Sequence, residues 1–405
     1  MGATEEIERI ALDPVLSVPE KDERIIAFLA QSDDRGVPAA VECLMTTSDR
    51  RVSEYVAAYL GLIHGAREEK ARVAERLRGA GEVAASAARL VPWMPDALID
   101  AFIQDHLAAA DPESPVSSVV FTIAMHRPER LRPYADQVES AAMQRSLLSG
   151  APDEFADSLL ERWRAEHDLN DLWTLALIRT SHAADLIESV MDEVADPNDW
   201  DWLMPLAGRL PDTRKPAGFP PAFLGFVADA GESAHVMGGD PGGDVPLCAD
   251  CRAPAERILT LSAEAMPNSL SRDPSFYWFT CECAEVDRIT VRFTSAGTEV
   301  YFNPQGPSSG ESRLIPGERS LVLEPHPNQN GVSLPAFPRT QRQVGGLPRW
   351  PSPETHPICP VCGNFMPFLM AIEGGSTPFG RMGFEELLFG FWCDSCAVSS
   401  TQTQN

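Results

Sequence analysis

Eight of the nine cysteines of this chain fall in four close pairs, a spacing typical of metal-binding sites. The pairs are Cys248 and Cys251, Cys281 and Cys283, Cys359 and Cys362, and Cys393 and Cys396. Two cysteines in one tight turn can both reach a single ion, and a second pair completes a tetrahedron with Zn–S distances of about 2.3 Å. The sequence therefore predicts two structural Zn²⁺ ions, each held by four thiolates.

The cysteine pairs belong to an internal repeat. A Gly-Gly-x-Pro segment, a Pro-x-Cys-x-x-Cys turn and an aromatic run ending in a cysteine pair occur at 238–283 and again at 345–396. The first copy shortens its second pair to Cys281-x-Cys283. We therefore expect a duplicated module with one ion in each copy, although the sequence leaves open which pairs share an ion.

Other interpretations of the cysteines are less well supported by their surroundings. A catalytic zinc usually has three protein ligands, often including His, and an open position, so four thiolates indicate a structural ion. His356 is close to Cys359 but surplus to both tetrahedra, and we expect it to be a loop residue. No thioredoxin-like βαβ pattern surrounds the pairs, which argues against a redox role. Cys43 stands alone in an apolar segment, and we expect it to be buried.

No arrangement typical of an enzyme accompanies these pairs. The sequence lacks a His-Glu-x-x-His helix and a Gly-x-x-x-x-Gly-Lys phosphate loop, and no Gly-x-Ser-x-Gly elbow precedes a helix. We therefore expect no catalytic residues, no cofactor other than zinc and no enzymatic activity.

The elements that must position the cysteines differ between the two halves. Residues 17–230 repeat apolar residues at three- and four-residue spacing, the stripe of amphipathic helices, with short breaks between them. Such short connections predict an irregular array of helical hairpins resembling HEAT repeats, with a compact bundle as the alternative. Beyond about residue 235, short apolar segments bounded by turn residues predict strands.

The predicted fold class is α+β and multidomain, with an all-α array followed by a duplicated β-rich zinc-binding module. We expect an acidic helical repeat domain at 1–232 and a first zinc-binding module at 233–303. A linker at 304–343 with a short strand near Leu321 would lead to a second zinc-binding module at 344–405.

The charge of the chain bears on its partners. It carries 59 acidic and 33 basic residues, and 151–200 alone holds 13 acidic and 3 basic ones. A net charge of −26 repels phosphate backbones and anionic membranes and attracts basic proteins. We therefore expect a basic protein partner, with a solvated outer face as the alternative interpretation of the acidic span.

Nucleic-acid binding is a further alternative, because zinc ribbons often contact nucleic acid and 301–350 is locally basic. The overall charge opposes it. No apolar stretch of about 18 residues occurs, and the start MGATEEIERI lacks the basic-then-apolar pattern of a signal peptide. We expect a cytoplasmic protein without membrane association.

The stretch VGGLPRWPSPETHPICPVCGNFMPFLMAI, followed by FWCDSCA, resembles the zinc module of the programmed cell death protein 2 family and its bacterial YwqG-like relatives. The shared pattern covers about residues 236–405. The resemblance implies a β-rich binding module without enzymatic activity. Eukaryotic members are described as chaperones of a basic ribosomal protein, and bacterial relatives have been proposed as immunity proteins against toxins. It therefore implies a toxin as the first candidate partner and a ribosomal protein as the second.

Overall fold

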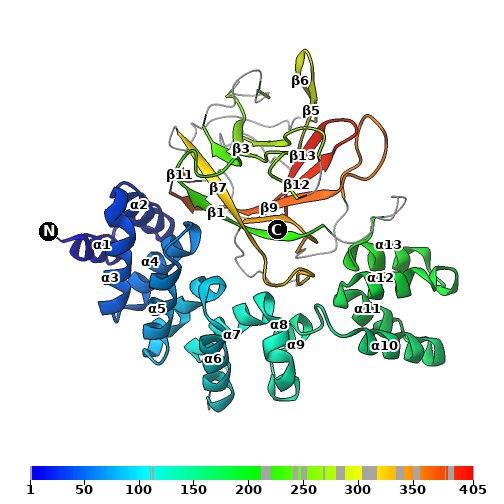
Figure 1. The fold of residues 1–405 in the computed structure, drawn as a ribbon, viewed down its shortest axis with the longest axis horizontal. Coiled ribbons are helices and arrows are strands. Elements are labelled where there is room, and N and C mark those ends of the chain that lie inside the picture. Colours follow the sequence, from blue (N-terminus) through cyan, green and yellow to red (C-terminus); the bar gives the residue numbers. More distant parts are fainter. Residues whose placement is uncertain are drawn as a thin grey trace.

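The computed structural model has a helical first half and a β-rich second half, which confirms the α+β class (Figure 1). It describes residues 2–109, 111, 114–210, 220–239, 245–247, 253–267, 270–279, 288–302, 317–333, 342–349, 356–378, 380–381 and 387–404.

The helices follow one another along an arc in Figure 1 and fit the expected repeat array. They are α1 (Ala3–Ala11), α2 (Val18–Ala30), α3 (Gly36–Thr46), α4 (Arg50–Leu62), α5 (Arg67–Leu77), α6 (Asp96–Ala108), α7 (Pro115–His126), α8 (Pro128–Leu131), α9 (Ala141–Ser146), α10 (Asp153–Glu166), α11 (Leu169–Ile178), α12 (Ser181–Glu188) and α13 (Pro197–Leu206). Among the described residues, four 3₁₀ segments lie between the helices: η1 (Asp33–Arg35), η2 (Gly81–Trp93), η3 (Arg132–Gln137) and η4 (Met191–Glu193).

Polar caps determine where several helices begin. The Ser17 hydroxyl accepts the backbone N–H of Glu20, and the Glu20 carboxylate accepts that of Ser17, which makes a capping box at α2. A single Asp side chain caps three further helices by accepting backbone N–H groups of the first turn: Asp49 at α4, Asp168 at α11 and Asp196 at α13. An apolar stripe follows each cap, so the local sequence sets both the start and the buried face of these helices.

The helices bury their apolar faces in two separate clusters. One cluster joins α1 to α9, and it includes Leu224 and Phe226 from the β-rich half. The other joins α10 to α13, with Leu159, Leu175 and Ile187 among its fully buried residues. The helical half therefore has two cores, and the first is completed by a strand.

Eleven of the described strands form one antiparallel sheet in the order β4-β3-β2-β7-β1-β8-β9-β12-β13-β5-β6. Their bounds are β1 (Ala222–Ala228), β2 (Val236–Gly238), β3 (Glu256–Thr260), β4 (Ser275–Trp278), β5 (Arg288–Thr294), β6 (Gly297–Phe302), β7 (Glu318–Pro325), β8 (Arg342–Gly345), β9 (Phe368–Glu373), β12 (Leu387–Cys393) and β13 (Val398–Gln404). A separate ribbon pairs β10 (Ser376–Thr377) with β11 (Gly380–Arg381).

The pairing at the centre of the sheet repeats itself. β1 and β7 pair with each other, and each also pairs with the Gly-Gly strand that follows the other: β1 with β8, and β7 with β2. Gly345 lies opposite Ala222, the first residue of β1, and Gly238 lies opposite Glu318, the first residue of β7. Each Gly-Gly strand therefore pairs with the strand that precedes the other Gly-Gly strand.

The sheet curls, so that β4 packs against β13. Phe276 of β4 lies inside the curl with Met370 and Leu388, and all three are fully buried. A Cβ atom added to Gly390 would lie 2.6 Å from Met370 Cε and 2.8 Å from Phe276 Cδ1, so a larger residue there would require these side chains to move. The curl therefore closes around a position that has no side chain.

β1 connects the sheet to the helical array. Leu224 and Phe226 pack into the first helical cluster, whereas Val227 belongs to the core of the sheet, as the alternation of a strand requires. The Phe226 ring lies 4.8 Å from that of Trp93, and the His64 N–H donates to the Val227 carbonyl at 2.8 Å. The two halves therefore share apolar core and a backbone hydrogen bond.

The strand expected near Leu321 is present as β7. β1 begins at Ala222, before residue 232, the expected end of the helical domain. Described strands from both expected modules and from 304–343 lie in one sheet, because strand pairing joins residues that are distant in sequence. The four-part division itself stays a prediction. No helix of the described residues is long and apolar enough to cross a membrane.

Candidate metal centre

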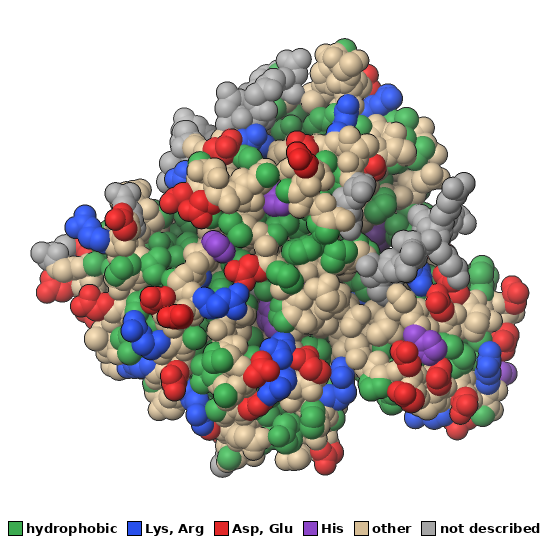
Figure 2. Space-filling model, viewed as in Figure 1, with side chains coloured by type: hydrophobic (Ala, Val, Ile, Leu, Met, Phe, Trp, Pro, Cys, Tyr) green, Lys and Arg blue, Asp and Glu red, His purple; other side chains and the backbone are tan. Residues whose placement is uncertain are grey.

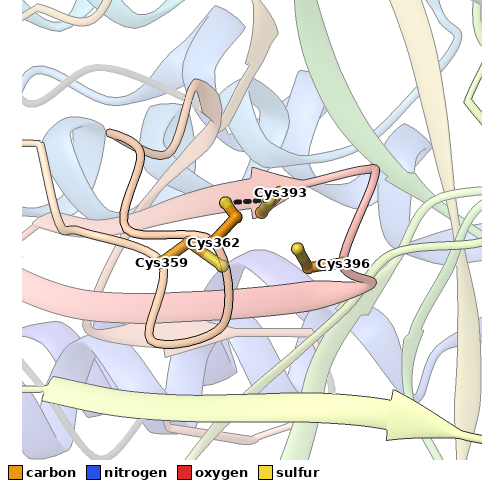
Figure 3. A group of neighbouring side chains, drawn as sticks. All are labelled: Cys359, Cys362, Cys393 and Cys396. Atoms are coloured by element: carbon orange, nitrogen blue, oxygen red, sulfur yellow. Dashed lines mark hydrogen bonds between the residues drawn. The ribbon is translucent and has the colours of Figure 1, made fainter.

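Four of the predicted ligands come together in the structure. The Sγ atoms of Cys359, Cys362, Cys393 and Cys396 all lie within 4.8 Å of one another, so these residues can hold a metal ion. Figure 3 shows the four side chains converging from a loop and from the turn at the end of β12. The pairing of the third and fourth cysteine pairs, which the sequence left open, is thereby resolved for this copy.

The first cysteine turn is held by backbone hydrogen bonds. The Cys359 N–H donates to the Asn364 carbonyl at 2.8 Å, and the Gly363 N–H donates to the Cys359 carbonyl at 2.9 Å. Gly363 adopts a φ of 74°, a conformation that glycine adopts without strain. An isolated bridge between Ile358 and Phe365 closes the base of the turn. These bonds bring the two thiols to one side of the loop.

The second cysteine turn connects β12 to β13. Cys393 ends β12 and lies opposite Val398, the first residue of β13. The Cys396 N–H donates to the Cys393 carbonyl at 3.3 Å, and Ala397 takes a φ of 53° to return the chain to the sheet. The strand pair therefore fixes the spacing of the second pair of thiols.

The geometry fits a tetrahedral thiolate site. Sulfur atoms at about 2.3 Å from Zn²⁺ lie about 3.8 Å apart, and the Cys362 and Cys393 Sγ atoms are 3.8 Å apart. Burial raises the pKa of the Cys359 thiol to about 12, although the N–H groups of Cys362 and Val361 act in the opposite direction. The N–H of Asn364 lowers the pKa of the Cys362 thiol. A bound cation would supply the charge that keeps the thiols deprotonated.

His356 lies beside this cluster without being part of it. Its Nδ1 donates to the Met366 carbonyl at 2.8 Å, and its ring lies edge-on to Phe391 at 5.2 Å. Burial lowers the pKa of His356 to about 4, so the ring is neutral at physiological pH. These contacts hold His356 beside the first cysteine turn and outside the ligand set, as expected for a surplus loop residue.

A second support comes from Asp394, which the sequence analysis did not single out. Its Oδ1 accepts the Ser271 N–H at 2.9 Å, the Ser271 hydroxyl at 3.0 Å and the Trp392 Nε1–H at 3.0 Å. Ser271 lies in the loop before β4, within the first copy. No local signal reveals this contact, because it exists only where the sheet curls.

The other predicted ligands, Cys248, Cys251, Cys281 and Cys283, lie outside the described residues, as does Trp350. The residues flanking the first of these pairs repeat the second copy. Leu247 bridges Pro254 as Ile358 bridges Phe365. The Ala255 N–H donates to the Pro246 carbonyl at 2.7 Å, and the Met366 N–H donates to the Pro357 carbonyl at 2.8 Å.

Cys43 lies fully buried in α3, and burial raises the pKa of its thiol to about 12. It packs in the first helical cluster, whereas Cys359, Cys393 and Cys396 lie in or against a separate apolar cluster of the sheet. The prediction that Cys43 is buried is confirmed.

Part of the chain is similar to a Salmonella typhimurium protein named Uncharacterized protein YpfL. The two sequences are 32% identical over 191 residues, which cover 45% of this chain and 41% of that protein. The chain thus matches less than half of that relative's length. No protein-family model matches the chain, and no solved structure matches it.

Proposed function

We propose that this protein is a non-enzymatic, zinc-stabilised cytoplasmic protein that captures a basic protein partner on an acidic lobe. The acidic lobe consists of α10 to α13, residues 153–206. The observation that carries the proposal is the negative charge of the surface of this lobe.

Acidic side chains far outnumber basic ones on the acidic lobe, although Asp157 pairs with His182 at 2.9 Å and Asp185 with Arg209 at 2.8 Å. Its exposed carboxylates include Asp153, Glu154, Asp157, Glu161, Glu166, Asp168, Asp185, Asp192, Glu193 and Asp196. Of the three basic residues in 151–200, Arg179 is fully buried and Arg162 is paired with Asp171 at 2.6 Å, which leaves Arg164. Figure 2 shows Asp and Glu gathered over this lobe at the lower right. Such a surface attracts cationic proteins.

Large apolar side chains are exposed among these acids. Phe155 is 40% exposed, Met191 54% and Trp202 46%. Aromatic residues and Met are enriched in protein interfaces, where they fill pockets of the partner while charges guide the approach. The combination supports protein binding in preference to a merely solvated face.

We assign the cysteine cluster a structural role with zinc as the metal. Four thiolates with no open position suit Zn²⁺ and leave no place for a substrate. The flanks of the Cys248 turn repeat those of the Cys359 turn, which supports a second ion at Cys248, Cys251, Cys281 and Cys283. The partner follows from the resemblance given above: a toxin first, a ribosomal protein second.

Charge reversal on the acidic lobe tests the proposal. The variant Glu161→Lys/Glu166→Lys changes two exposed carboxylates of α10, and the control Glu42→Lys/Glu75→Lys makes the same change of net charge on α3 and α5. Both variants and the wild-type protein would be tagged and used to capture partners from native lysate, with elution by a salt gradient and identification by mass spectrometry.

We expect one stoichiometric basic protein that salt releases from the wild-type protein and from the control. The α10 variant should bind this protein about threefold to tenfold more weakly at low salt, because two favourable charge contacts become repulsive. Equal loss of binding in both variants would show that net charge alone attracts the partner. Recovery of nucleic acid in place of a protein would contradict the proposal.

A further inference from the structure

Four basic side chains are buried together where the helical array meets the sheet. His126 ends α7 and Arg179 follows α11, while His326 follows β7 and Arg349 follows β8. Arg179 is 0% exposed, both histidines are 2% exposed and Arg349 is 8% exposed. We call these four residues the buried basic cluster.

The members of the buried basic cluster lie in contact with one another. The His126 and His326 rings stack with centroids 5.0 Å apart and planes 9° apart, and Arg349 Nη2 contacts His326 Nε2. Arg179 Nη2 donates to the Pro348 carbonyl, next to Arg349, at 2.6 Å. Both arginines lie near Gly331, since a Cβ atom there would be 3.7 Å from Arg179 Nη1 and 3.8 Å from Arg349 Cγ.

Donors face donors in this cluster. The Asn328 N–H donates to His326 Nδ1 at 3.0 Å, so the proton of the neutral ring lies on Nε2, beside the Arg349 guanidinium. Asn328 is itself fixed by hydrogen bonds to the Met125 carbonyl at 3.2 Å and the Ser149 hydroxyl at 3.1 Å. Two donors held against each other leave both protons without an acceptor at this contact.

Several polar atoms of the cluster lack a partner. Among the described residues, no hydrogen bond reaches Arg179 Nε or Nη1, Arg349 Nε or His126 Nδ1, and the side-chain partners of the two arginines are the Pro348 carbonyl and His326, not a carboxylate. Burial, and then the charge of Arg349, lower the pKa of Arg179 to about 9, which still leaves both guanidinium groups charged at neutral pH. A buried charge without a counter-charge is strongly destabilising, and buried unsatisfied donors commonly mark an ion or water.

We propose that the buried basic cluster binds a small oxyanion such as inorganic phosphate or sulfate. Guanidinium forks match the oxygen spacing of such anions, and the anion would accept the hydrogen bonds that now lack a partner. Because every contributing side chain is more than nine-tenths buried, the anion has to be small. It would connect α7 and α11 to the segments after β7 and β8, a role separate from partner capture on the acidic lobe.

The test uses the full-length protein. Denatured, purified protein would be analysed by ion chromatography for a retained oxyanion, and protein dialysed into chloride would be titrated with inorganic phosphate at constant ionic strength. We expect either one equivalent of retained phosphate or sulfate per chain, or saturable 1:1 binding by calorimetry. In the second case, the melting temperature should rise with the logarithm of the phosphate concentration.

Matched variants assign the effect to the cluster. Arg179→Met should lose the retained anion or bind phosphate about tenfold or more weakly, because a charge-assisted fork is removed. Arg349→Lys keeps the charge and serves as a second variant if Arg179→Met does not fold. Arg162→Met removes an exposed arginine of α10 and should retain the full response.

Two results would overturn the proposal. One is wild-type protein that neither retains nor binds a stoichiometric oxyanion. The other is a phosphate response that Arg179→Met and Arg349→Lys leave as large as it is in the wild-type protein.

Discussion

Lys70, in α5, is a lysine whose side chain has no exposure to solvent. It is fully buried between the array and β1, where its Nζ lies 3.7 Å from the centre of the Trp93 ring and donates to the Ile63 carbonyl at 2.7 Å. These contacts offset part of the cost of burying a charge. Even so, burial lowers the pKa of Lys70 from 10.5 to about 7.

This depressed pKa predicts a pH dependence of stability. Between pH 7 and 10.5 the unfolded chain binds a proton at Lys70 that the folded chain does not, so the free energy of unfolding should rise with pH across that window. The rise should be on the order of a few kcal/mol. Below the folded pKa both states are protonated, and this contribution stays constant. Urea unfolding at several pH values in the window measures it.

Two substitutions of Lys70 provide the controls from opposite sides. Lys70→Met removes the titrating group, and Lys70→Arg keeps a charge that does not titrate in this range. In both variants the free energy of unfolding should no longer rise with pH. The Met variant should have about the stability that the wild-type protein reaches at high pH, and the Arg variant should be much less stable than that. A slope that persists in both variants would mean that other groups cause it.

At the scale of elements, the cysteine turns are the feature that should determine the stability of the sheet. Cys359→Ser/Cys362→Ser should lower the zinc content by about one ion per chain, and Cys248→Ser/Cys251→Ser should do the same if the first copy holds its own ion. Structural zinc contributes about 10–16 kcal/mol of apparent binding free energy in small modules. Because strands beside both cysteine turns lie in one hydrogen-bonded sheet, either variant should weaken the whole sheet.

Metal analysis by mass spectrometry and near-ultraviolet circular dichroism of the buried tryptophans measure these effects. Cys43→Ala is the matched control, since it removes a buried cysteine from the first helical cluster and should leave the zinc content unchanged. The result that would contradict this view is loss of tertiary signal in only one copy, or full zinc content after substitution of Cys359 and Cys362.

The elements also show which features of the fold can be predicted from the sequence alone. The cysteine spacing predicted the Cys359, Cys362, Cys393 and Cys396 cluster, and apolar periodicity predicted the helices, because both signals are local. The pairing of β1 with β8 and of β7 with β2 joins distant segments and has no local signature. For the same reason the Asp394–Ser271 contact and the buried basic cluster could not be predicted, since each assembles residues more than a hundred positions apart.

For the molecule as a whole, β1 makes the helical array and the sheet parts of one folding unit. Leu224 and Phe226 complete the first helical core, while β1 occupies the middle of the sheet between β7 and β8. A cut before β1 would expose apolar surface on both pieces, and burying side chains such as these is worth about 1.5–3 kcal/mol each. The halves 1–210 and 220–405 should therefore be poorly soluble when expressed separately.

Co-expression of the two halves should restore a soluble complex, because the interface needs no covalent connection once both cores can form. Size-exclusion chromatography and circular dichroism would detect it. Phe226→Asp in the second half should prevent reassembly by placing a charge in the helical core, whereas Val300→Asp, on the outer strand β6 and 40% exposed, should not. If residues 1–210 alone give a stable, cooperatively melting protein, the array folds independently and does not need its contacts with β1.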